Sequence, residues 1–135
     1  LLNANPKTQL LLGASLDVLH HESKEWLETI AFWKEEMQFF HKLLHLQDPL
    51  NKSDQIYRGL LDDLEKIKSS IFTELQADVI EHERMLSKLE RNEKGLSDSD
   101  YRELHSNILE KMETMTGYFK KFKKVVFGFV KDLRS

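Results

Sequence analysis

The sequence predicts an all-α protein, an up-down-up antiparallel bundle of three long helices in one domain, residues 1–135. Five glycines and two prolines in 135 residues leave little material for the many turns of a β-protein. Hydrophobic residues make up 40% of the chain and charged residues 32%, which is typical of a folded helical domain. The hydrophobic residues also recur at spacings of three and four, the period of an amphipathic helix. Residues 1–13 leave open a short N-terminal helix or an irregular lead-in.

The first long helix is predicted over about 14–46, a rod of roughly 50 Å. Its hydrophobic stripe keeps alternating steps of four and three, which predicts a slowly supercoiled, coiled-coil-like helix. The stripe consists of Leu19, Ser23, Trp26, Ile30, Trp33, Met37, Phe40 and Leu44. Five further apolar residues widen it beyond a two-stranded seam, as a core of three or four helices requires, namely Leu27, Ala31, Phe32, Phe39 and Leu43.

The second helix is predicted over about 54–92. Asp48-Pro49 ends the first helix, and Asn51 or Ser53 is expected to cap the second. Three consecutive steps of four separate Ile67 from Val79, a departure from the heptad that should relax the supercoil locally. The full stripe is Leu60, Leu64, Ile67, Ile71, Leu75, Val79, His82, Leu86 and Leu89.

The third helix is predicted over about 98–133. Gly95 favours a helix stop, and Ser97 or Asp98 is expected to cap the new helix. The short connections place neighbouring helices antiparallel. The expected stripe is Tyr101, His105, Ile108, Met112, Met115, Phe119, Phe122, Val126, Phe129 and Leu133.

Composition narrows the function classes. A net charge of −3 creates no global field for nucleic acid, and no apolar stretch is long enough to span a bilayer. We therefore expect neither nucleic acid nor membrane as a partner. The absence of cysteine excludes disulfides, thiolate metal sites and a cysteine nucleophile, and fits a reducing cytoplasm. Because the chain starts at Leu1, a removed signal peptide is not observable.

The two expected chain reversals place histidines that are distant in the sequence at similar levels along the bundle axis. If the chain reverses near Pro49 and near Gly95, His20 of the first helix lies level with His82 of the second, and His105 of the third lies one turn nearer the end. Imidazole and carboxylate suit Zn, Fe or Mn, so the sequence predicts a candidate metal site near one end of the bundle. Its candidate ligands are His20, Glu22, Glu81, His82 and His105.

One further residue belongs to this interpretation. Asp78 lies one turn before His82 and is expected to orient that imidazole. The competing interpretation is structural, because core histidines are often neutral and hydrogen-bonded to a carboxylate or a carbonyl. No phosphate-binding loop or nucleophile motif is present, so the sequence favours a protein that is not an enzyme.

A run of lysines marks the third helix at Lys120, Lys121, Lys123 and Lys124, interleaved with Phe119 and Phe122. Because the two phenylalanines belong to the core stripe, we interpret the lysines as partners in interhelical ion pairs. The acidic residues expected at that height are Glu35, Glu36, Asp62, Asp63 and Glu65.

Two segments, LHHESKEWLETIAFWKEEMQFFHKLL at 19–44 and IEHE at 80–83, resemble a group of small helical proteins of Bacteroidetes-type bacteria. The matching positions are Leu19, His20, Glu22, Trp26, Phe32, Lys34, Glu36, Glu81, His82 and Glu83. Ser23 stands where that group's pattern has a second histidine. The resemblance implies a helical fold and a bacterial source, and no activity.

The leading functional hypothesis is a non-enzymatic interaction module that self-associates or binds a partner helix. It rests on apolar surface in excess of what a three-helix core buries, carried by Trp26, Trp33, Phe32, Phe39 and the Phe-rich third helix. The alternative is metal binding or metal storage at the His and carboxylate cluster. A third hypothesis is a small-molecule sensor with a pocket among the aromatic residues.

Overall fold

The computed structural model describes residues 15–47, 54–91 and 97–134. The prediction of an all-helical chain of three long helices is confirmed, and these ranges contain no strand. The elements are α2 (Leu16–His45), α4 (Gln55–Ser69), η1 (Ser70–Leu75), α5 (Gln76–Glu90) and α6 (Asp98–Arg134). α4, η1 and α5 follow one another without a break and form the second long helix. The short helix considered for residues 1–13 lies outside the described residues.

Each long helix begins at a side chain that accepts hydrogen bonds from free backbone N–H groups. Ser15 Oγ accepts from Val18 N over 3.3 Å at the start of α2. Asp54 Oδ1 accepts from Ile56 N over 2.7 Å at the start of α4, so Asp54 caps this helix and the expectation of Asn51 or Ser53 was wrong. Ser97, one of the two predicted caps of the third helix, accepts from Asp100 N over 3.0 Å.

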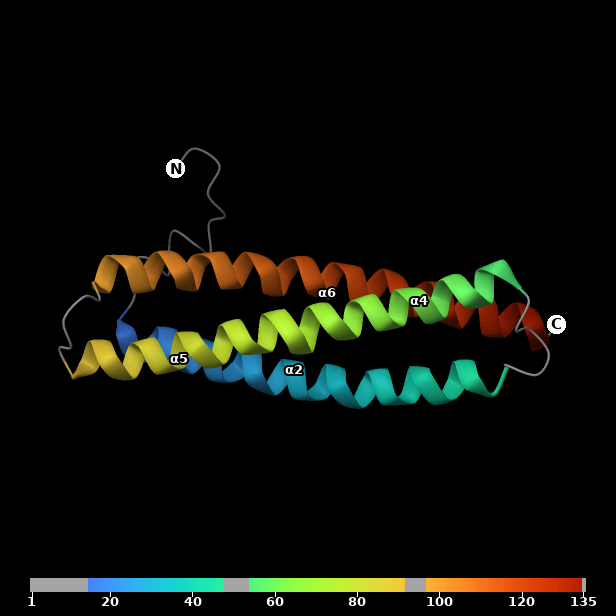
Figure 1. Ribbon diagram of the computed structural model, residues 1–135, viewed down its shortest axis with the longest axis horizontal. Helices are drawn as coiled ribbons and strands as arrows, with labels where there is room; N and C mark the ends of the chain where they lie inside the picture. Colours follow the sequence, from blue (N-terminus) through green and yellow to red (C-terminus); the bar gives the residue numbers. More distant parts are fainter. Residues whose placement is uncertain (1–14, 48–53, 92–96, 135) are drawn as a thin grey trace, which may run out of the picture.

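The long helices lie side by side along one axis (Figure 1). α2 and α6 run in the same direction, and α4, η1 and α5 run in the opposite direction (Figure 1). The chain passes from one end of the molecule to the other three times. This path puts the first turns of α2 and α6 beside the last turns of α5, the arrangement that positions the site.

The predicted stripe of α2 is buried at all eight positions, from Leu19 to Leu44. The stripe of α6 holds as far as Val126 and then changes. Val130 is buried and Phe129 is half-buried, while Leu133 is 42% exposed, so Leu133 was wrongly assigned to the core. A helix with 3.6 residues per turn drifts away from a strict heptad, and a step of four after Val126 follows that drift.

The departure from the heptad in the second helix coincides with a π-helical turn. η1 is a π-helix, and it contains the middle one of the three consecutive steps of four, from Ile71 to Leu75. A π-turn accommodates one extra residue within an α-helix. Both Ile71 and Leu75 remain buried, so the extra residue leaves the core-facing side unchanged.

The core is narrower than the sequence indicates. Leu27 and Leu43 are half-buried, whereas Ala31, Phe32 and Phe39 are exposed and do not widen the stripe. Phe32 is 59% exposed and Phe39 is 54% exposed. Over the described ranges, none of the helices combines the length and hydrophobicity that crossing a bilayer requires.

Candidate functional site

Two buried histidines and one half-buried glutamate form a hydrogen-bonded chain that joins α2, α5 and α6 near one end of the molecule. His82 Nε2 lies 2.9 Å from His105 Nδ1. His105 Nε2 lies 3.0 Å from Glu22 Oε1. The two histidines are 2% and 1% exposed, and the Glu22 side chain is 15% exposed. One hydrogen-bonded chain therefore runs from the molecular surface at Glu22 into the core at His82.

The carboxylate of Glu22 determines which ring nitrogens of the two histidines carry a hydrogen. With Glu22 ionised, His105 Nε2 carries a hydrogen and donates it to Glu22 Oε1. The Nδ1 atom of a neutral His105 then accepts from the Nε2–H of His82. His82 Nδ1 is left as an acceptor, and it is buried with no hydrogen-bond partner among the described residues.

Aromatic rings enclose both imidazoles. Tyr101 stacks on His82 with ring centroids 4.2 Å apart and an interplanar angle of 2°. Trp26 lies against His105 with centroids 4.5 Å apart. Removal from water lowers the pKa of His82 to about 4, with a smaller contribution from the charge on His105. Burial also lowers the pKa of His105, although the hydrogen bond to Glu22 opposes that shift.

A second polar group borders this chain. His20 Nδ1 lies 2.6 Å from Glu83 Oε2, which links α2 to α5. Burial raises the pKa of Tyr101, the negative charges of Glu83 and Glu90 raise it further, and Ser23 and Arg102 oppose the shift. Ser23 Oγ lies near Tyr101 Oη, and neither atom has a hydrogen bond of normal geometry within the described ranges.

Three of the five predicted metal ligands therefore converge and two do not. Glu22, His82 and His105 form the chain, as the fold-back heights indicated. His20 pairs with Glu83, whose position directly after His82 was the available signal for its role. Glu81 is exposed and pairs with Arg84 over 2.7 Å. Across the described ranges, no three His, Cys, Asp or Glu side chains are arranged to hold a metal ion.

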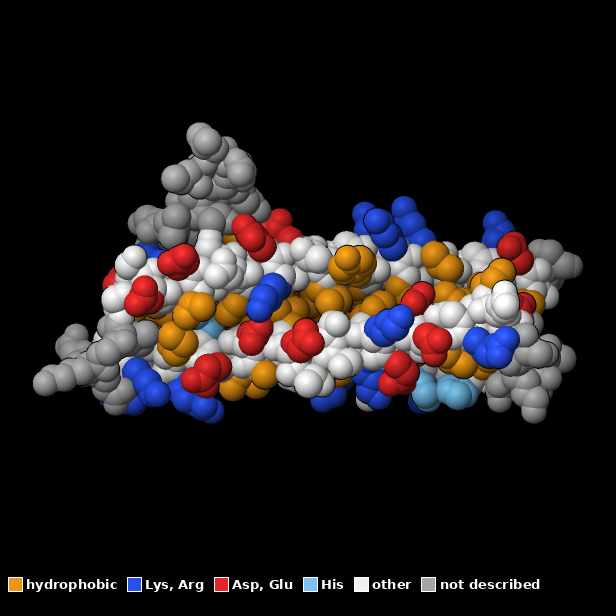
Figure 2. Space-filling model, turned by 45° about the horizontal axis from the view of Figure 1, so that its top comes forward, with side chains coloured by type: hydrophobic (Ala, Val, Ile, Leu, Met, Phe, Trp, Pro, Cys, Tyr) orange, Lys and Arg blue, Asp and Glu red, His pale blue; other side chains and the backbone are white. Residues whose placement is uncertain are grey.

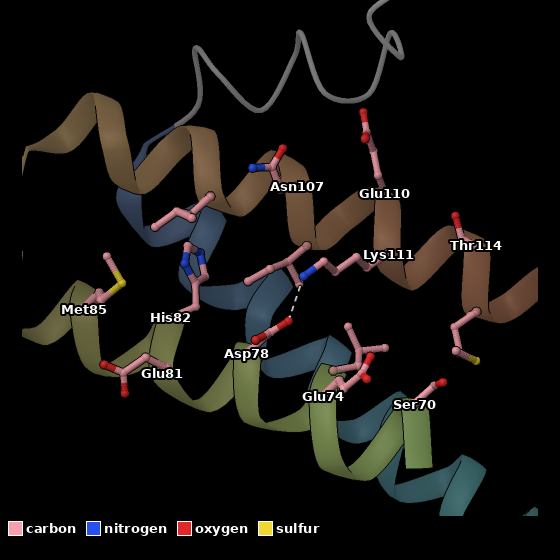
Figure 3. Close-up of a pocket in the computed structure, with 14 residues that line it drawn as sticks. Ser70, Glu74, Asp78, Glu81, His82, Met85, Asn107, Glu110, Lys111 and Thr114 are labelled. Atoms are coloured by element: carbon pink, nitrogen blue, oxygen red, sulfur yellow. Dashed lines mark hydrogen bonds and ion pairs between the residues drawn. The ribbon is translucent and has the colours of Figure 1, made fainter. Parts of the chain in front are cut away.

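The expectation that Asp78 orients the imidazole of His82 was wrong. Asp78 Oδ2 accepts a hydrogen bond from Lys111 Nζ over 2.9 Å and does not contact His82 (Figure 3). The carboxylate of Asp78 reaches Lys111 of α6, one helical turn away from the imidazole of His82 (Figure 3). The orienting carboxylate comes instead from Glu22, on a different helix.

An open apolar groove runs beside the chain, between α6 and the second long helix. Two adjoining hollows of about 720 Å³ and 450 Å³ form it, and both include Ser70 and Met115. Figure 2 shows a line of hydrophobic side chains along this groove. His82 lies among the residues of the larger hollow (Figure 3), so the buried chain reaches the floor of the groove.

The charges along this groove are segregated. The hollow beside α5 contains four carboxylates, Glu74, Asp78, Glu81 and Glu110, and one lysine, Lys111. The hollow beside α4 contains two lysines, Lys66 and Lys121, and one carboxylate, Asp63. One end of the groove is therefore acidic and the other is weakly basic.

The lysine run of α6 is only partly paired. Lys123 Nζ lies 2.9 Å from Glu36 Oε2, one of the predicted interhelical pairs. Lys120, Lys121 and Lys124 have no ion pair within the described ranges, contrary to the expectation that acidic neighbours neutralise the run. The reason is geometric, because these three side chains leave α6 toward solvent.

Comparisons of the chain with protein families, with curated proteins and with solved structures gave no match.

Proposed function

We propose that this protein is a non-enzymatic interaction module that self-associates through the groove between α6 and the second long helix, as an up-down-up bundle facing a second copy of itself. The supporting observation is a row of three exposed apolar residues on one face of α6, separated by fourteen and then seven residues, with Lys111 at the intervening heptad position. Leu104 is 38% exposed, Tyr118 is 60% exposed and Val125 is 53% exposed. Residues separated by multiples of seven lie on the same face of a helix, so this row offers a contact surface to another helix.

The charge pattern supports a second copy in an antiparallel arrangement. Two-fold symmetry places the acidic end of one groove against the weakly basic end of the other. In the parallel arrangement, the four carboxylates beside α5 would face the same four carboxylates of the other copy. Like-charge contacts of that kind disfavour association.

Sedimentation velocity on wild type and Tyr118→Glu tests this proposal. A carboxylate at position 118 would lie within this row, so the dimer should dissociate at concentrations where wild type is dimeric. Phe32→Glu is the matched control, because Phe32 is a similarly exposed aromatic residue on α2 and lies outside the groove. Monomeric wild type at millimolar concentration would overturn the proposal, as would equal dimerisation of both variants.

Cysteine cross-linking tests the antiparallel arrangement, since the natural chain has no cysteine. The midpoint of the row from Leu104 to Val125 falls at Thr114. Thr114→Cys should therefore form an intermolecular disulfide, whereas Val125→Cys should not, because its two copies lie about 30 Å apart by helical rise. Efficient cross-linking of Val125→Cys would indicate a parallel dimer.

Metal binding at the buried chain is the second candidate function, supported by the convergence of Glu22, His82 and His105. Two nitrogen ligands of a tetrahedral zinc ion lie roughly 3.3 Å apart, so a metal ion would displace the shared proton and separate the rings from 2.9 Å. Calorimetric titration of untagged protein with Zn²⁺, Fe²⁺ or Mn²⁺ tests this function. Micromolar binding that His82→Ala abolishes supports it, and binding no tighter than millimolar eliminates it.

A further inference from the structure

A second surface lies on the opposite side of α6, along the seam between α2 and α6. Of the long helices, α2 and α6 approach one another least. Their seam contains a hollow of about 410 Å³ lined by Phe39, Phe40 and Phe127 together with Lys120, Lys123, Lys124 and Glu36. None of the residues of this hollow belongs to the groove proposed for self-association.

The α2 side of the seam is apolar. Phe32, Phe39 and Leu46 follow at intervals of seven residues and are 59%, 54% and 74% exposed. Because residues seven apart share a helix face, they form one row, roughly 21 Å long by helical rise. Phe127, which is 52% exposed, faces this row from α6 and packs against Phe40 with ring centroids 5.4 Å apart.

The α6 side of the seam is cationic. Lys120 and Lys124 lie one turn apart on α6 and have no ion-pair partner within the described ranges. Lys123 is held by Glu36, so its charge is compensated. The hollow thus contains three lysines and one carboxylate. An apolar row and a cationic row run beside one another along the same seam.

We propose that this seam is a docking site for an amphipathic helix of another protein, with an apolar stripe and acidic residues along one edge. The apolar stripe would pack on Phe32, Phe39 and Phe127, and the acidic edge would pair with Lys120 and Lys124. A hollow between two helices that run in the same direction accepts the ridge of a third helix better than a flat surface. A row of about 21 Å corresponds to about four helical turns of partner. This site is independent of the proposed self-association.

The acidic helix α5 of a second copy fits the seam poorly. The acidic helix α5 has one large hydrophobic residue with substantial exposure, Ile80 at 46%, and the other members of its apolar stripe are buried or half-buried. Such a helix offers no apolar stripe to the seam. The expected occupant is therefore a partner with its own exposed stripe.

The test uses a synthetic fluorescent helical peptide of about four turns, with leucine at the first and fourth heptad positions and glutamate at the flanking positions. Fluorescence anisotropy should give micromolar affinity for wild type and at least tenfold weaker binding for Phe39→Ser and for Lys120→Glu/Lys124→Glu. Lys121→Glu is the matched control, because Lys121 lines the other groove, and its binding should stay within twofold of wild type.

Three outcomes would overturn the proposal. The first is equal binding of a peptide with lysine in place of glutamate. The second is loss of self-association in Phe39→Ser, measured by sedimentation, which would make the seam a contact between copies. The third is wild-type binding to vesicles of phosphatidylglycerol and phosphatidylcholine without binding to the acidic peptide. Because Tyr118→Glu disrupts only the groove, it should retain peptide binding whether or not the protein self-associates.

Discussion

The most informative residues are the two histidines that share a proton between their rings. His82 and His105 are both neutral in the arrangement that Glu22 imposes, and together they carry one donor to the carboxylate and one unused acceptor at His82 Nδ1. A buried neutral chain of this kind resists protonation, because a charge on either ring would lie against Tyr101 and Trp26 rather than water. Protonation and folding are therefore linked at this site.

The linkage predicts how stability depends on pH. The pKa of His82 is about 6.5 in the unfolded chain and about 4 in the folded protein, so the unfolded chain binds the extra proton between these values. The free energy of unfolding should be highest above pH 6.5 and fall by about 3 kcal/mol as the pH drops toward 4. Urea unfolding at a series of pH values, followed by circular dichroism, measures it.

His82→Gln isolates this contribution, since an amide donates to His105 Nδ1 and does not titrate. Its stability should fall less steeply below pH 6.5 than that of wild type. His41→Gln replaces an exposed histidine and should follow the wild-type curve. Parallel curves for wild type and His82→Gln would contradict the linkage.

Glu22 should stabilise the fold mainly as the acceptor for His105. Glu22→Ala leaves the buried Nε2–H of His105 unpaired, at a cost of about 1–3 kcal/mol in the free energy of unfolding. Glu22→Gln keeps an acceptor oxygen and should lose less. NMR titration of His105 gives a second measure, because removing the carboxylate should lower the pKa of His105 further. An unchanged His105 titration in Glu22→Ala would rule out this role.

At the scale of the element, the second long helix differs from the other two in its extra residue. The positions from Leu60 to His82 would follow steps of four and three throughout if one residue between Ile71 and Leu75 were absent. The π-helix η1 covers that interval. The apolar stripes of both halves of the helix therefore face the core, and the one extra residue is accommodated within the π-helical turn.

Deleting Thr73, an exposed residue of η1, should convert the π-turn into α-helix and restore the heptad. We expect thermal unfolding of this variant to remain cooperative, with a melting temperature equal to or above that of wild type. Deletion of Glu65, an exposed residue of α4, is the control, because it introduces a shift where the heptad is regular. A large loss of stability on deleting Thr73, equal to that of the control, would refute this account.

The same element shows where sequence reasoning succeeds and where it ends. Steps of four and three locate the buried face of α2 and the interval of η1, because burial on one helix face is a local, periodic property. The positions of the chain reversals predict that His82 and His105 lie at similar levels along the bundle, because the rise per residue of a helix is constant. Side-chain direction is not fixed by height, so Asp78 pairs with Lys111, Glu81 pairs with Arg84 and His20 pairs with Glu83.

At the scale of the whole molecule, the chain has two apolar surfaces on opposite sides of α6. The groove contains Tyr118 and Val125, and the seam contains Phe39 and Phe127, all at least half exposed. Trp26 and Trp33, which were expected to contribute to an apolar excess, lie in the core, and the exposed apolar surface is divided between two sites of different electrostatic character. The groove changes sign along its length, which suits a second copy, whereas the seam has a positive surplus, which suits an acidic partner.

The proposed antiparallel dimer predicts that a charge reversal can be restored by a second reversal in the same chain, because each copy supplies both charges. Glu110 and Lys121 lie four and seven residues from the midpoint of the row at Thr114, so Lys121 of one copy would lie within one helical turn of Glu110 of the other. Lys121→Glu should weaken dimerisation measured by sedimentation, and the weakening should be largest at low salt. The double variant Lys121→Glu/Glu110→Lys should restore it, because each copy then supplies both reversed charges. If the double variant were no more dimeric than Lys121→Glu, charge pairing across this groove would not orient the two copies.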